Sequence, residues 1–510
     1  MLAKVLSAAH FGLETVLVEV EVNLAQKGFP GFYIIGLPSK AVEEAKERVK
    51  TALANCGIDF PQAKIIVNLA PADLPKEGSC YDLPIAMGIL GCLRMVELPF
   101  DKSFFYGELS LDGTLRHTKG VFLLGLAAKE KGIKNLFVPA LSANECNVFD
   151  GIQVYPVESL TKLMSHLNNE QPIKKLDPTK FESESEKVSE EFDFAEILGQ
   201  EQAKRALEIA AAGGHNILLQ GPPGAGKTML ARALSGILPP LTEKESLEVT
   251  KIYSATGNIP PGGSLIRQRP FRTAHHTISQ IGLIGGGSQP HPGEISLSHC
   301  GVLFLDELPE FARATLEALR QPMEDGVVNI SRAAGSAQFP SRFMLVAASN
   351  PCPCGFWQDP KKQCRCTPRQ ILSYQNRLSG PLLERIDLHL HVPAVEIERL
   401  IPENVPKQES SKVIKQRVKK AREVQEHRFL KTNIHTNAEM KNKHLKKFCH
   451  VSPEALRLLK QAASSFQLSA RSYFRLIKIS QTIADLDAEK RISPNHAAEA
   501  LQYRLKVQEK

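Results

Sequence analysis

The pattern of hydrophobic and polar positions changes along the chain and divides it into four regions. Residues 1–167 contain two apolar runs, FYIIGLP and AKIIVNLAP, which predict buried strands, and an amphipathic stretch that predicts a helix ending at Gly57. Residues 168–192 are rich in Ser, Glu and Lys and lack apolar periodicity, which predicts a linker. Residues 193–395 show an α/β pattern, and residues 396–510 predict helices, two of which begin at Ser-Pro pairs.

Length and composition narrow the class of protein. A chain of 510 residues can form roughly two to four domains. It has no run of eighteen apolar residues, so we expect no membrane-spanning helix. Residues 18–22 alternate apolar and acidic side chains, as in a strand of a folded domain rather than a signal peptide. Ten cysteines, six of them scattered, are typical of a reducing compartment, and we predict a cytoplasmic protein.

Positive charge is concentrated in one segment. Residues 401–450 hold 13 Lys and Arg against 5 Asp and Glu, a difference that equals the net charge of +8 of the whole chain. A basic segment can bind a polyanion such as DNA. The commoner explanation of a Lys-rich helix is a solvated face, and the composition leaves both open.

A nucleotide-binding motif follows an apolar strand predicted at residues 216–220. The sequence GPPGAGKT fits G-x-x-x-x-G-K-[ST], and a helix is predicted after it at 229–238. Glycines let backbone N–H groups surround phosphate oxygens, the Lys reaches the β- and γ-phosphates, and the Thr hydroxyl binds Mg²⁺. The residues expected to bind ATP and Mg²⁺ are Gly221, Pro222, Pro223, Gly224, Ala225, Gly226, Lys227 and Thr228.

Two later strands end in polar residues. GVLFLDELPEF ends in Asp306, expected to hold Mg²⁺, and Glu307, expected to activate the attacking water as general base. RFMLVAASNP ends in Asn350, which is expected to position that water. Arg385 is predicted in a turn and Arg471 at a helix start; either arginine alone would more often form a surface ion pair.

Taken together, these motifs resemble an AAA+ ATPase of the magnesium-chelatase-like branch, and specifically the bacterial YifB/ComM family. The stretches that carry the resemblance are GQEQAKRALEIAAAGGHNILLQGPPGAGKTMLA, RTAHHTIS, GEISLSHCGVLFLDELPEF, AASNPCPCG, LLERIDLH and ARSYFRLIKISQTIADL. The resemblance implies that Asn350 is sensor 1, Arg385 an arginine finger offered to a neighbouring subunit and Arg471 sensor 2. It further implies that residues 193–200 lie beside the adenine, that residues 396–510 form a helical lid and that the protein is a homo-hexamer.

The family also has two insertions that face the pore of the ring. One lies within residues 262–296 and the other at 327–345, where the sequence predicts a hairpin with Arg332 near its tip. The resemblance implies that such a hairpin grips a DNA backbone. A structural hairpin with a solvated Arg is the alternative.

The N-terminal region resembles the proteolytic domain of Lon, which uses a Ser nucleophile and a Lys. Matching PKEG places Cys80 near the nucleophile position, and matching LAAKEKGI places Phe122 where the Lys would fall, with Lys119 three residues away. A thiol without a positioned base is poorly activated, so we expect no peptidase activity. Cys80 is expected to be a small core residue on a buried helix.

The loop CPCGFWQDPKKQCRC, residues 352–366, places two C-x-C pairs beside the predicted sensor strand. A disulfide is disfavoured in a cytosolic chain, and C-x-C is not the redox motif C-x-x-C. Four thiolates can hold a tetrahedral Zn²⁺, although the short spacers depart from the usual ones. The predicted zinc ligands are Cys352, Cys354, Cys364 and Cys366. Trp357, Lys361 and Lys362 are candidates for DNA contact through stacking and charge, while Trp357 packed against the ATPase surface is the alternative.

The sequence is compatible with three functions. The first is a hexameric helicase or branch-migration motor that acts on branched or single-stranded/duplex DNA junctions. The resemblance implies that it would work with recombination proteins during natural transformation. The second is a magnesium-chelatase subunit, disfavoured because those subunits are expected to lack the Lon-like domain and the four-cysteine loop. The third is an ATP-dependent protease or unfoldase, disfavoured by the missing Ser/Lys pair.

Overall fold

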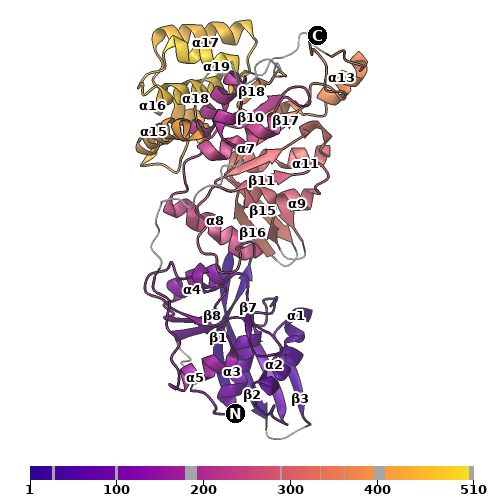
Figure 1. The fold of residues 1–510 in the computed structure, drawn as a ribbon, viewed down its shortest axis with the longest axis vertical. Coiled ribbons are helices and arrows are strands. Elements are labelled where there is room, and N and C mark those ends of the chain that lie inside the picture. The colour runs from indigo at the N-terminus through magenta and orange to yellow at the C-terminus, as the bar shows by residue number, and fades with distance from the viewer. Residues whose placement is uncertain are drawn as a thin grey trace.

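The chain forms an elongated molecule with the N-terminal domain at one end and an α/β core and a helical part at the other (Figure 1). Within the described residues no helix is long and apolar enough to cross a membrane, and the ten cysteines carry free thiols. The computed structural model describes residues 1–25, 29–97, 102–178, 192–287, 290–332, 335–360, 362–394 and 408–504.

The N-terminal domain is built on a mixed seven-stranded sheet in the order β3-β4-β2-β1-β5-β8-β9. The helix predicted to end at Gly57 is split at Glu44 into α1 and α2. The sheet strands are β1 (Leu2–Phe11), β2 (Glu14–Ala25), β3 (Gly31–Ile35), β4 (Lys64–Ala70), β5 (Ser103–Phe105), β8 (Asn135–Pro139) and β9 (Gln153–Val157). The other elements are β6 (Glu108–Leu109), β7 (Leu115–Arg116), α1 (Lys40–Glu43), α2 (Ala45–Asn55), α3 (Asp82–Cys92), α4 (Val121–Lys131) and α5 (Leu160–Leu167).

The first part of the predicted linker packs on this domain. The backbone N–H of Leu176 donates to the carbonyl oxygen of Val154 in β9 at 3.0 Å. Ile173 and Leu176 also pack against the N-terminal hydrophobic core, since they are apolar residues in an otherwise polar stretch. The remainder of the linker, residues 179–191, lies outside the described residues.

The α/β core is built on a five-stranded parallel sheet in the order β11-β14-β17-β10-β18. Because the strands are parallel, the polar residues that follow β10, β14 and β17 lie together at the carboxyl ends of the strands. The strands are β10 (Ile217–Gln220), β11 (Phe271–Ala274), β14 (Val302–Leu305), β17 (Met344–Ser349) and β18 (Leu388–His391). The helices are α6 (Glu201–Gly213), α7 (Lys227–Ile237), α8 (Glu243–Thr256), α9 (Gln280–Ile284), α10 (Glu294–Leu297), α11 (Arg313–Ala318), α12 (Arg320–Asp325), α13 (Pro368–Gln375) and α14 (Gly380–Leu383).

The C-terminal part is helical, as predicted, and packs on α6 and α7 of the core. Ser452 caps one helix by accepting a hydrogen bond from the N–H of Ala455 at 3.2 Å, with Pro453 in the first turn. The boundary predicted at residue 396 lies outside the described residues, as do residues 505–510. The helices are α15 (Ser411–Phe429), α16 (Asn442–Phe448), α17 (Pro453–Ser465), α18 (Ala470–Leu486) and α19 (Pro494–Gln502).

The N-terminal domain and the core share a packed interface. The turn between β1 and β2 inserts Phe11 and Leu13 into the hydrophobic cluster of the core. Helix α4 lies against α8, and the N–H of Gly120 donates to the carbonyl oxygen of Ser254 at 3.0 Å. The predicted hairpin, β15 (Val327–Arg332) and β16 (Gly335–Pro340), is present and lies between the two domains (Figure 1).

Candidate active site

The phosphate-binding loop connects the end of β10 to the start of α7. Gly224 and Gly226 have φ angles of +79° and +84°, which only glycine adopts readily. At Gly221 a Cβ atom would lie 2.1 Å from the carbonyl oxygen of Val392, so the loop approaches the strand beside it too closely for any side chain. The loop leads directly into the N-terminus of α7, which begins at Lys227 rather than at 229, and unpaired N–H groups there favour a phosphate.

Lys227 is fixed by three oxygen atoms. Its Nζ donates to the carbonyl oxygens of Gly221 at 2.7 Å and Pro222 at 2.9 Å, and to Oδ1 of Asn350 at 3.1 Å. Burial lowers the pKa of the ammonium group, and the charges of Asp306 and Glu307 oppose that shift. Asn350 follows β17, which is paired with β10, so the predicted sensor and the P-loop lysine are in direct contact.

A hydroxyl and a carboxylate meet where Mg²⁺ is expected. Oγ1 of Thr228 donates to Oδ2 of Asp306 at 2.9 Å. Oδ1 of Asp306 accepts the backbone N–H of Glu307 at 2.9 Å, which orients the carboxylate. Oxygen donors of this kind are the ligands that Mg²⁺ prefers, so the pair fits the predicted metal site.

Glu307 has a strained backbone, with φ of +51° and ψ of +45°. The left-handed backbone conformation is uncommon for a non-glycine residue and costs on the order of 1–3 kcal/mol. Such strained residues are concentrated at functional sites. Its Oε2 lies 3.3 Å from Nδ1 of His276, a residue just after β11. Sequence reasoning did not single out His276, although it stands in the family stretch RTAHHTIS. The two side chains meet because β11 and β14 are neighbouring strands.

The segment predicted to lie beside the adenine borders the phosphate loop. Nε2 of Gln200 donates to the carbonyl oxygen of Pro393 at 2.8 Å and to that of Ala225, in the loop, at 3.4 Å. Asp193 accepts the N–H of Ser411 at 2.9 Å, which ties the segment to α15. These bonds place residues 193–200 between the loop and the C-terminal helices.

The two predicted arginines lie at the amino-terminal ends of the strands, opposite the ends that carry the phosphate loop. Arg385 comes just before β18, and its carbonyl oxygen accepts from Asn216, at the start of β10. Nη2 of Arg385 lies 2.7 Å from Oε1 of Glu324, and Arg471 contacts the same oxygen. Strand β10, which runs from this end of the sheet to the phosphate loop, is four residues long, about 13 Å. The arginines therefore share one carboxylate and do not face the P-loop of their own chain.

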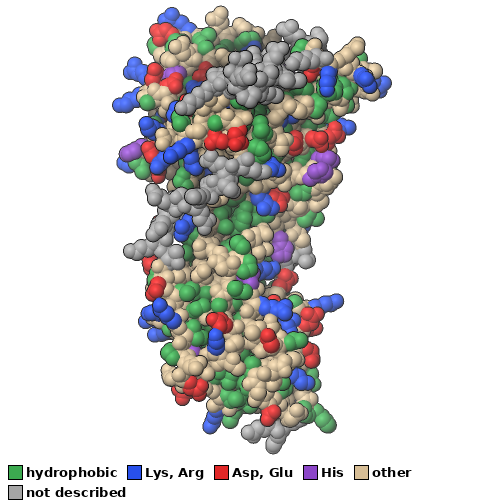
Figure 2. Space-filling view, viewed as in Figure 1, with side chains coloured by type: hydrophobic (Ala, Val, Ile, Leu, Met, Phe, Trp, Pro, Cys, Tyr) green, Lys and Arg blue, Asp and Glu red, His purple; other side chains and the backbone are tan. Residues whose placement is uncertain are grey.

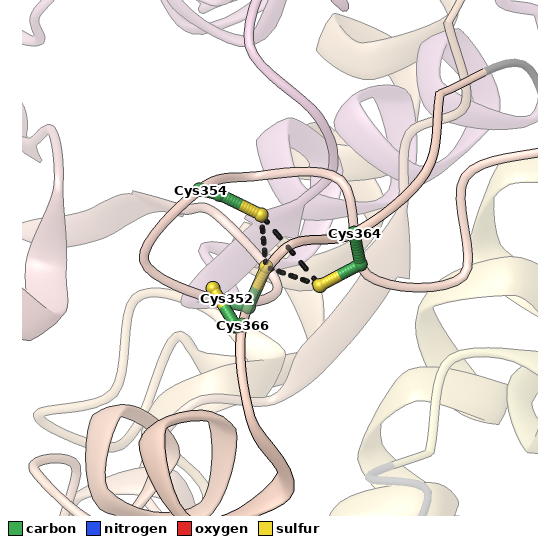
Figure 3. Close-up of side chains that lie close together, drawn as sticks. All are labelled: Cys352, Cys354, Cys364 and Cys366. Atoms are coloured by element: carbon green, nitrogen blue, oxygen red, sulfur yellow. Dashed lines mark hydrogen bonds between the residues drawn. The ribbon is translucent and has the colours of Figure 1, made fainter.

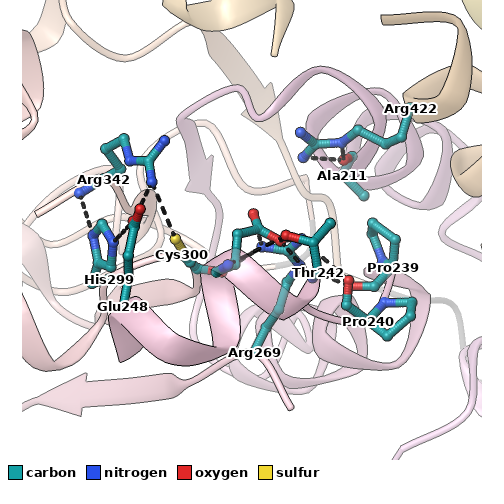
Figure 4. Close-up of polar contacts among 11 residues, drawn as sticks. Ala211, Pro239, Pro240, Thr242, Glu248, Arg269, His299, Cys300, Arg342 and Arg422 are labelled. Atoms are coloured by element: carbon teal, nitrogen blue, oxygen red, sulfur yellow. Dashed lines mark hydrogen bonds and ion pairs between the residues drawn. The ribbon is translucent and has the colours of Figure 1, made fainter. Parts of the chain in front are cut away.

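A cleft of about 1240 Å³ between the core and the helical part extends from these arginines to Cys300 and Arg342. These two residues belong to a network of polar contacts (Figure 4). His299, Cys300 and Glu248 lie close enough together to suggest a metal site. Nε2 of His299 is 3.1 Å from Glu248, however, and its Nδ1 accepts the backbone N–H of Arg342 at 3.0 Å. The Arg342 guanidinium also binds Glu248. Both imidazole nitrogens are thus engaged, and the group is a closed ion-pair network.

The four cysteines of the loop at 352–366 converge (Figure 3). Sγ of Cys352 lies 3.4 Å from that of Cys354 and 3.8 Å from that of Cys364, and the Cys354–Cys364 separation is 3.6 Å. All four sulfur atoms, including that of Cys366, lie within 4.8 Å of one another. A tetrahedron with Zn–S bonds of about 2.3 Å has edges of about 3.8 Å, so the donors fit a zinc ion.

The aromatic and basic residues of this loop are only in part presented to solvent. Trp357 is half-buried. Nζ of Lys362 lies over the ring of Phe356 at 4.9 Å, a cation–π contact within the loop itself. Lys361 lies outside the described residues.

The two predicted insertions lie side by side. Nε of Arg332, at the end of β15, is 3.3 Å from the carbonyl oxygen of Gly287, which follows the short strand β12 (Gly285–Gly286). β12 pairs with β13 (His291–Pro292). Arg332 is exposed, while residues 288–289 and 333–334 lie outside the described residues.

The Lon-like part buries its candidate nucleophile. Cys80 is 5% exposed and sits in the turn before α3, so the prediction that it lies on a helix is wrong by two residues. Burial raises its pKa to about 12, which Tyr106 and Lys119 offset only in part. Phe122, at the position of the Lon lysine, is buried in α4. A thiol with such a pKa is protonated at neutral pH and is a poor nucleophile.

Family models of magnesium chelatase cover most of the chain. Residues 193–400 match the model described as magnesium chelatase, subunit ChlI. Residues 18–142 match subunit ChlI of Mg-chelatase, and residues 408–504 match the ChlI C-terminal model. The three matches follow the N-terminal domain, the core and the helical part.

Full-length relatives have the same extent. The chain is 43% identical to competence protein ComM of Haemophilus influenzae over 99% of this chain and 98% of that protein. It is 42% identical to YifB of Escherichia coli over 97% and 96% of the two chains. A shorter match, 31% identical over 29% of this chain and 28% of the other, is to Lon protease 2 of Bacillus subtilis.

Proposed function

Since the chain belongs to the YifB/ComM family of magnesium-chelatase-like AAA+ ATPases, we propose that it is a ring-forming, ATP-driven DNA motor that moves branched recombination intermediates. Lys227 would bind the phosphates, Thr228 and Asp306 would hold Mg²⁺, and Glu307 would activate the attacking water. Asn350 would orient that water. Mg²⁺, when bound, neutralises charge on the phosphates.

The observation that carries the proposal is the position of Arg385 and Arg471 at the amino-terminal ends of the strands, whereas Lys227 lies at the carboxyl ends. Arginines there complete an ATP site only if a second subunit brings its phosphate loop to this end of the sheet. Head-to-tail contact of this kind is heterologous and forms a ring when the rotation between subunits closes; the family resemblance implies a hexamer. ATP turnover would then be coupled to movement between neighbouring subunits.

Exposed lysines support a DNA partner. In α15 the arginines are used internally: Arg417 pairs with Glu208, and Arg422 donates to the carbonyl oxygen of Ala211. Among the described residues 408–450, the exposed lysines are Lys412, Lys419, Lys420, Lys431, Lys441, Lys443, Lys446 and Lys447. Lys and Arg side chains also gather at the upper left of Figure 2, near α15 to α17. Such a surface suits phosphate contacts, and the ComM relative is named a competence protein, which fits action during natural transformation.

The test is strand movement. Purified protein with ATP and Mg²⁺ is added to a labelled four-way junction and to a three-strand intermediate, with Glu307→Gln protein as the matched control. We expect ATP-dependent product from the unmodified chain only, together with stimulation of ATPase activity by DNA. Absence of both would contradict the proposal.

The names of the family models favour a chelatase subunit as the second candidate. Because the N-terminal region itself matches a ChlI model, that region does not argue against a chelatase, and the four-cysteine loop becomes the main distinguishing feature. A chelatase subunit would support Mg²⁺ insertion into a porphyrin when mixed with its partner subunits. It would not respond to DNA.

We also propose that the four-cysteine loop holds one Zn²⁺ per chain. The support is the set of four sulfur donors at separations that suit tetrahedral coordination. Metal analysis of the purified chain, and its loss in a Cys364→Ser variant, tests this.

A further inference from the structure

The four-cysteine loop and the phosphate-binding loop touch. Gly355, directly after Cys354, is buried and has a φ angle of +83°. A Cβ atom on it would lie 2.5 Å from Cδ and 3.1 Å from Cγ of Pro223, the third residue of the phosphate-binding loop. The backbone at Gly355 therefore rests against Pro223 with no room for a side chain.

A second connection runs through β17. Asn350, which accepts from Lys227, is followed by Pro351 and then by Cys352, which is fully buried. The carbonyl oxygen of Pro351 accepts from Nε2 of Gln375 in α13 at 3.1 Å. The chain between the sensor and the first cysteine is thus held at both ends, and two candidate metal ligands lie within four residues of Asn350.

These contacts define what a metal would do here. The turn that carries Cys352, Cys354 and Gly355 is closed by a backbone hydrogen bond, from Gly355 N–H to the Cys352 carbonyl at 2.9 Å. So small a loop has almost no core of its own, and metal ligation would supply most of its folding free energy. Without the metal, the turn that rests against Pro223 would lose most of this support, while the start of the loop would still be held through Asn350 and Pro351.

We infer that metal binding at the four cysteines and ATP binding at the phosphate loop are linked, so that each strengthens the other. In this role the metal centre supports the nucleotide site. This role is separate from the DNA contact that the sequence of the loop suggests. Coupling free energies between sites commonly correspond to changes in affinity of about 5- to 150-fold, and the effect is reciprocal. We expect about a tenfold effect here. The inference rests on the proposed zinc and ATP sites, but it requires neither DNA nor a ring.

The experiment uses the full chain loaded with Zn²⁺. The dissociation constant of a fluorescent, non-hydrolysable ATP analogue is measured before and after a zinc-selective chelator, with Mg²⁺ in excess. Removal of zinc should raise that constant about tenfold, and the analogue should slow zinc loss to the chelator. Equal nucleotide affinity with and without zinc, or a chain that binds no zinc, would overturn the inference.

A glycine substitution tests the contact without removing a ligand. Gly355→Ala should keep one zinc per chain and weaken nucleotide binding, because its Cβ would displace Pro223. Gly132→Ala is the matched control: its φ angle is also positive, at +70°, but nothing lies within 4 Å of an added Cβ. Zinc-loaded Gly355→Ala protein with unchanged nucleotide affinity would refute the linkage. Failure of the junction assay alongside intact linkage would count only against the DNA motor.

Discussion

Nη2 of Arg385 and Oε1 of Glu324 form an ion pair of 2.7 Å at the end of the sheet that lies away from the phosphate-binding loop. Arg471 binds the same carboxylate oxygen, and the combined influence of the two guanidinium groups holds the pKa of Glu324 below its usual value, against the effect of burial. One carboxylate thus binds two cations, one from the turn before β18 and one from α18. A γ-phosphate of a neighbouring subunit carries more negative charge and would compete for both.

The first prediction is that ATP sites are shared between subunits. Arg385→Ala and Lys227→Ala proteins should each lose ATPase activity, by about 10³-fold or more for the arginine. When the two inactive proteins are mixed and reassembled, about a quarter of random head-to-tail contacts pair an intact Lys227 with an intact Arg385. Activity should therefore return in the mixture. A mixture as inactive as its components would show that Arg385 acts within its own chain or not at all.

The second prediction concerns Glu307 and its partner. Glu307→Gln should bind ATP with an affinity close to that of the unmodified chain but hydrolyse it at least about 100-fold more slowly, because the amide cannot accept a proton from water. His276→Ala should lower kcat about tenfold and leave ATP affinity unchanged, because the imidazole positions the base. Single-turnover hydrolysis and equilibrium binding separate the two effects. Normal hydrolysis by Glu307→Gln would refute the assignment of the base.

The third prediction concerns the exposed lysines of α15. Lys412→Glu, Lys419→Glu and Lys420→Glu change exposed residues and should weaken DNA binding at moderate salt. Each lysine that contacts a phosphate should reduce the dependence of log K on log salt by about one. The control is the same substitution at an exposed lysine of the N-terminal domain, Lys129→Glu. Identical salt slopes for all variants would place the DNA elsewhere.

Local sequence determined much of the catalytic geometry but not the contacts between distant segments. Asp306 and Asn350 could be predicted to approach the P-loop, because the ends of parallel strands meet at one edge. The pairing of His276 with Glu307 depends on strand order, and the joint contact of Arg385 and Arg471 with Glu324 depends on how α18 packs on the core. The contact of Gly355 with Pro223 has no counterpart in spacing or periodicity.

The interface between the N-terminal domain and the core contains a buried acid. Glu145 is 1% exposed, and its Oε2 accepts from Oγ of Ser254 in α8 at 2.7 Å and from the N–H of Phe122 at 3.3 Å. Burial raises its pKa to about 7, and the two hydrogen bonds oppose that shift only in part. The folded chain therefore binds this proton more tightly than the unfolded chain, in which the pKa is near 4.5.

The fourth prediction follows from the direction of this shift. The contribution of protonated Glu145 to stability is complete below about pH 4.5 and is lost as pH rises through about 7, which lowers the free energy of unfolding by on the order of 1–3 kcal/mol. Thermal unfolding between pH 5 and 8 should show this fall in the unmodified chain. Glu145→Gln, which stays neutral, should flatten the profile, while Glu158→Gln, an exposed substitution in the same domain, should preserve it. Parallel profiles for Glu145→Gln and the unmodified chain would show that another group controls the pH dependence.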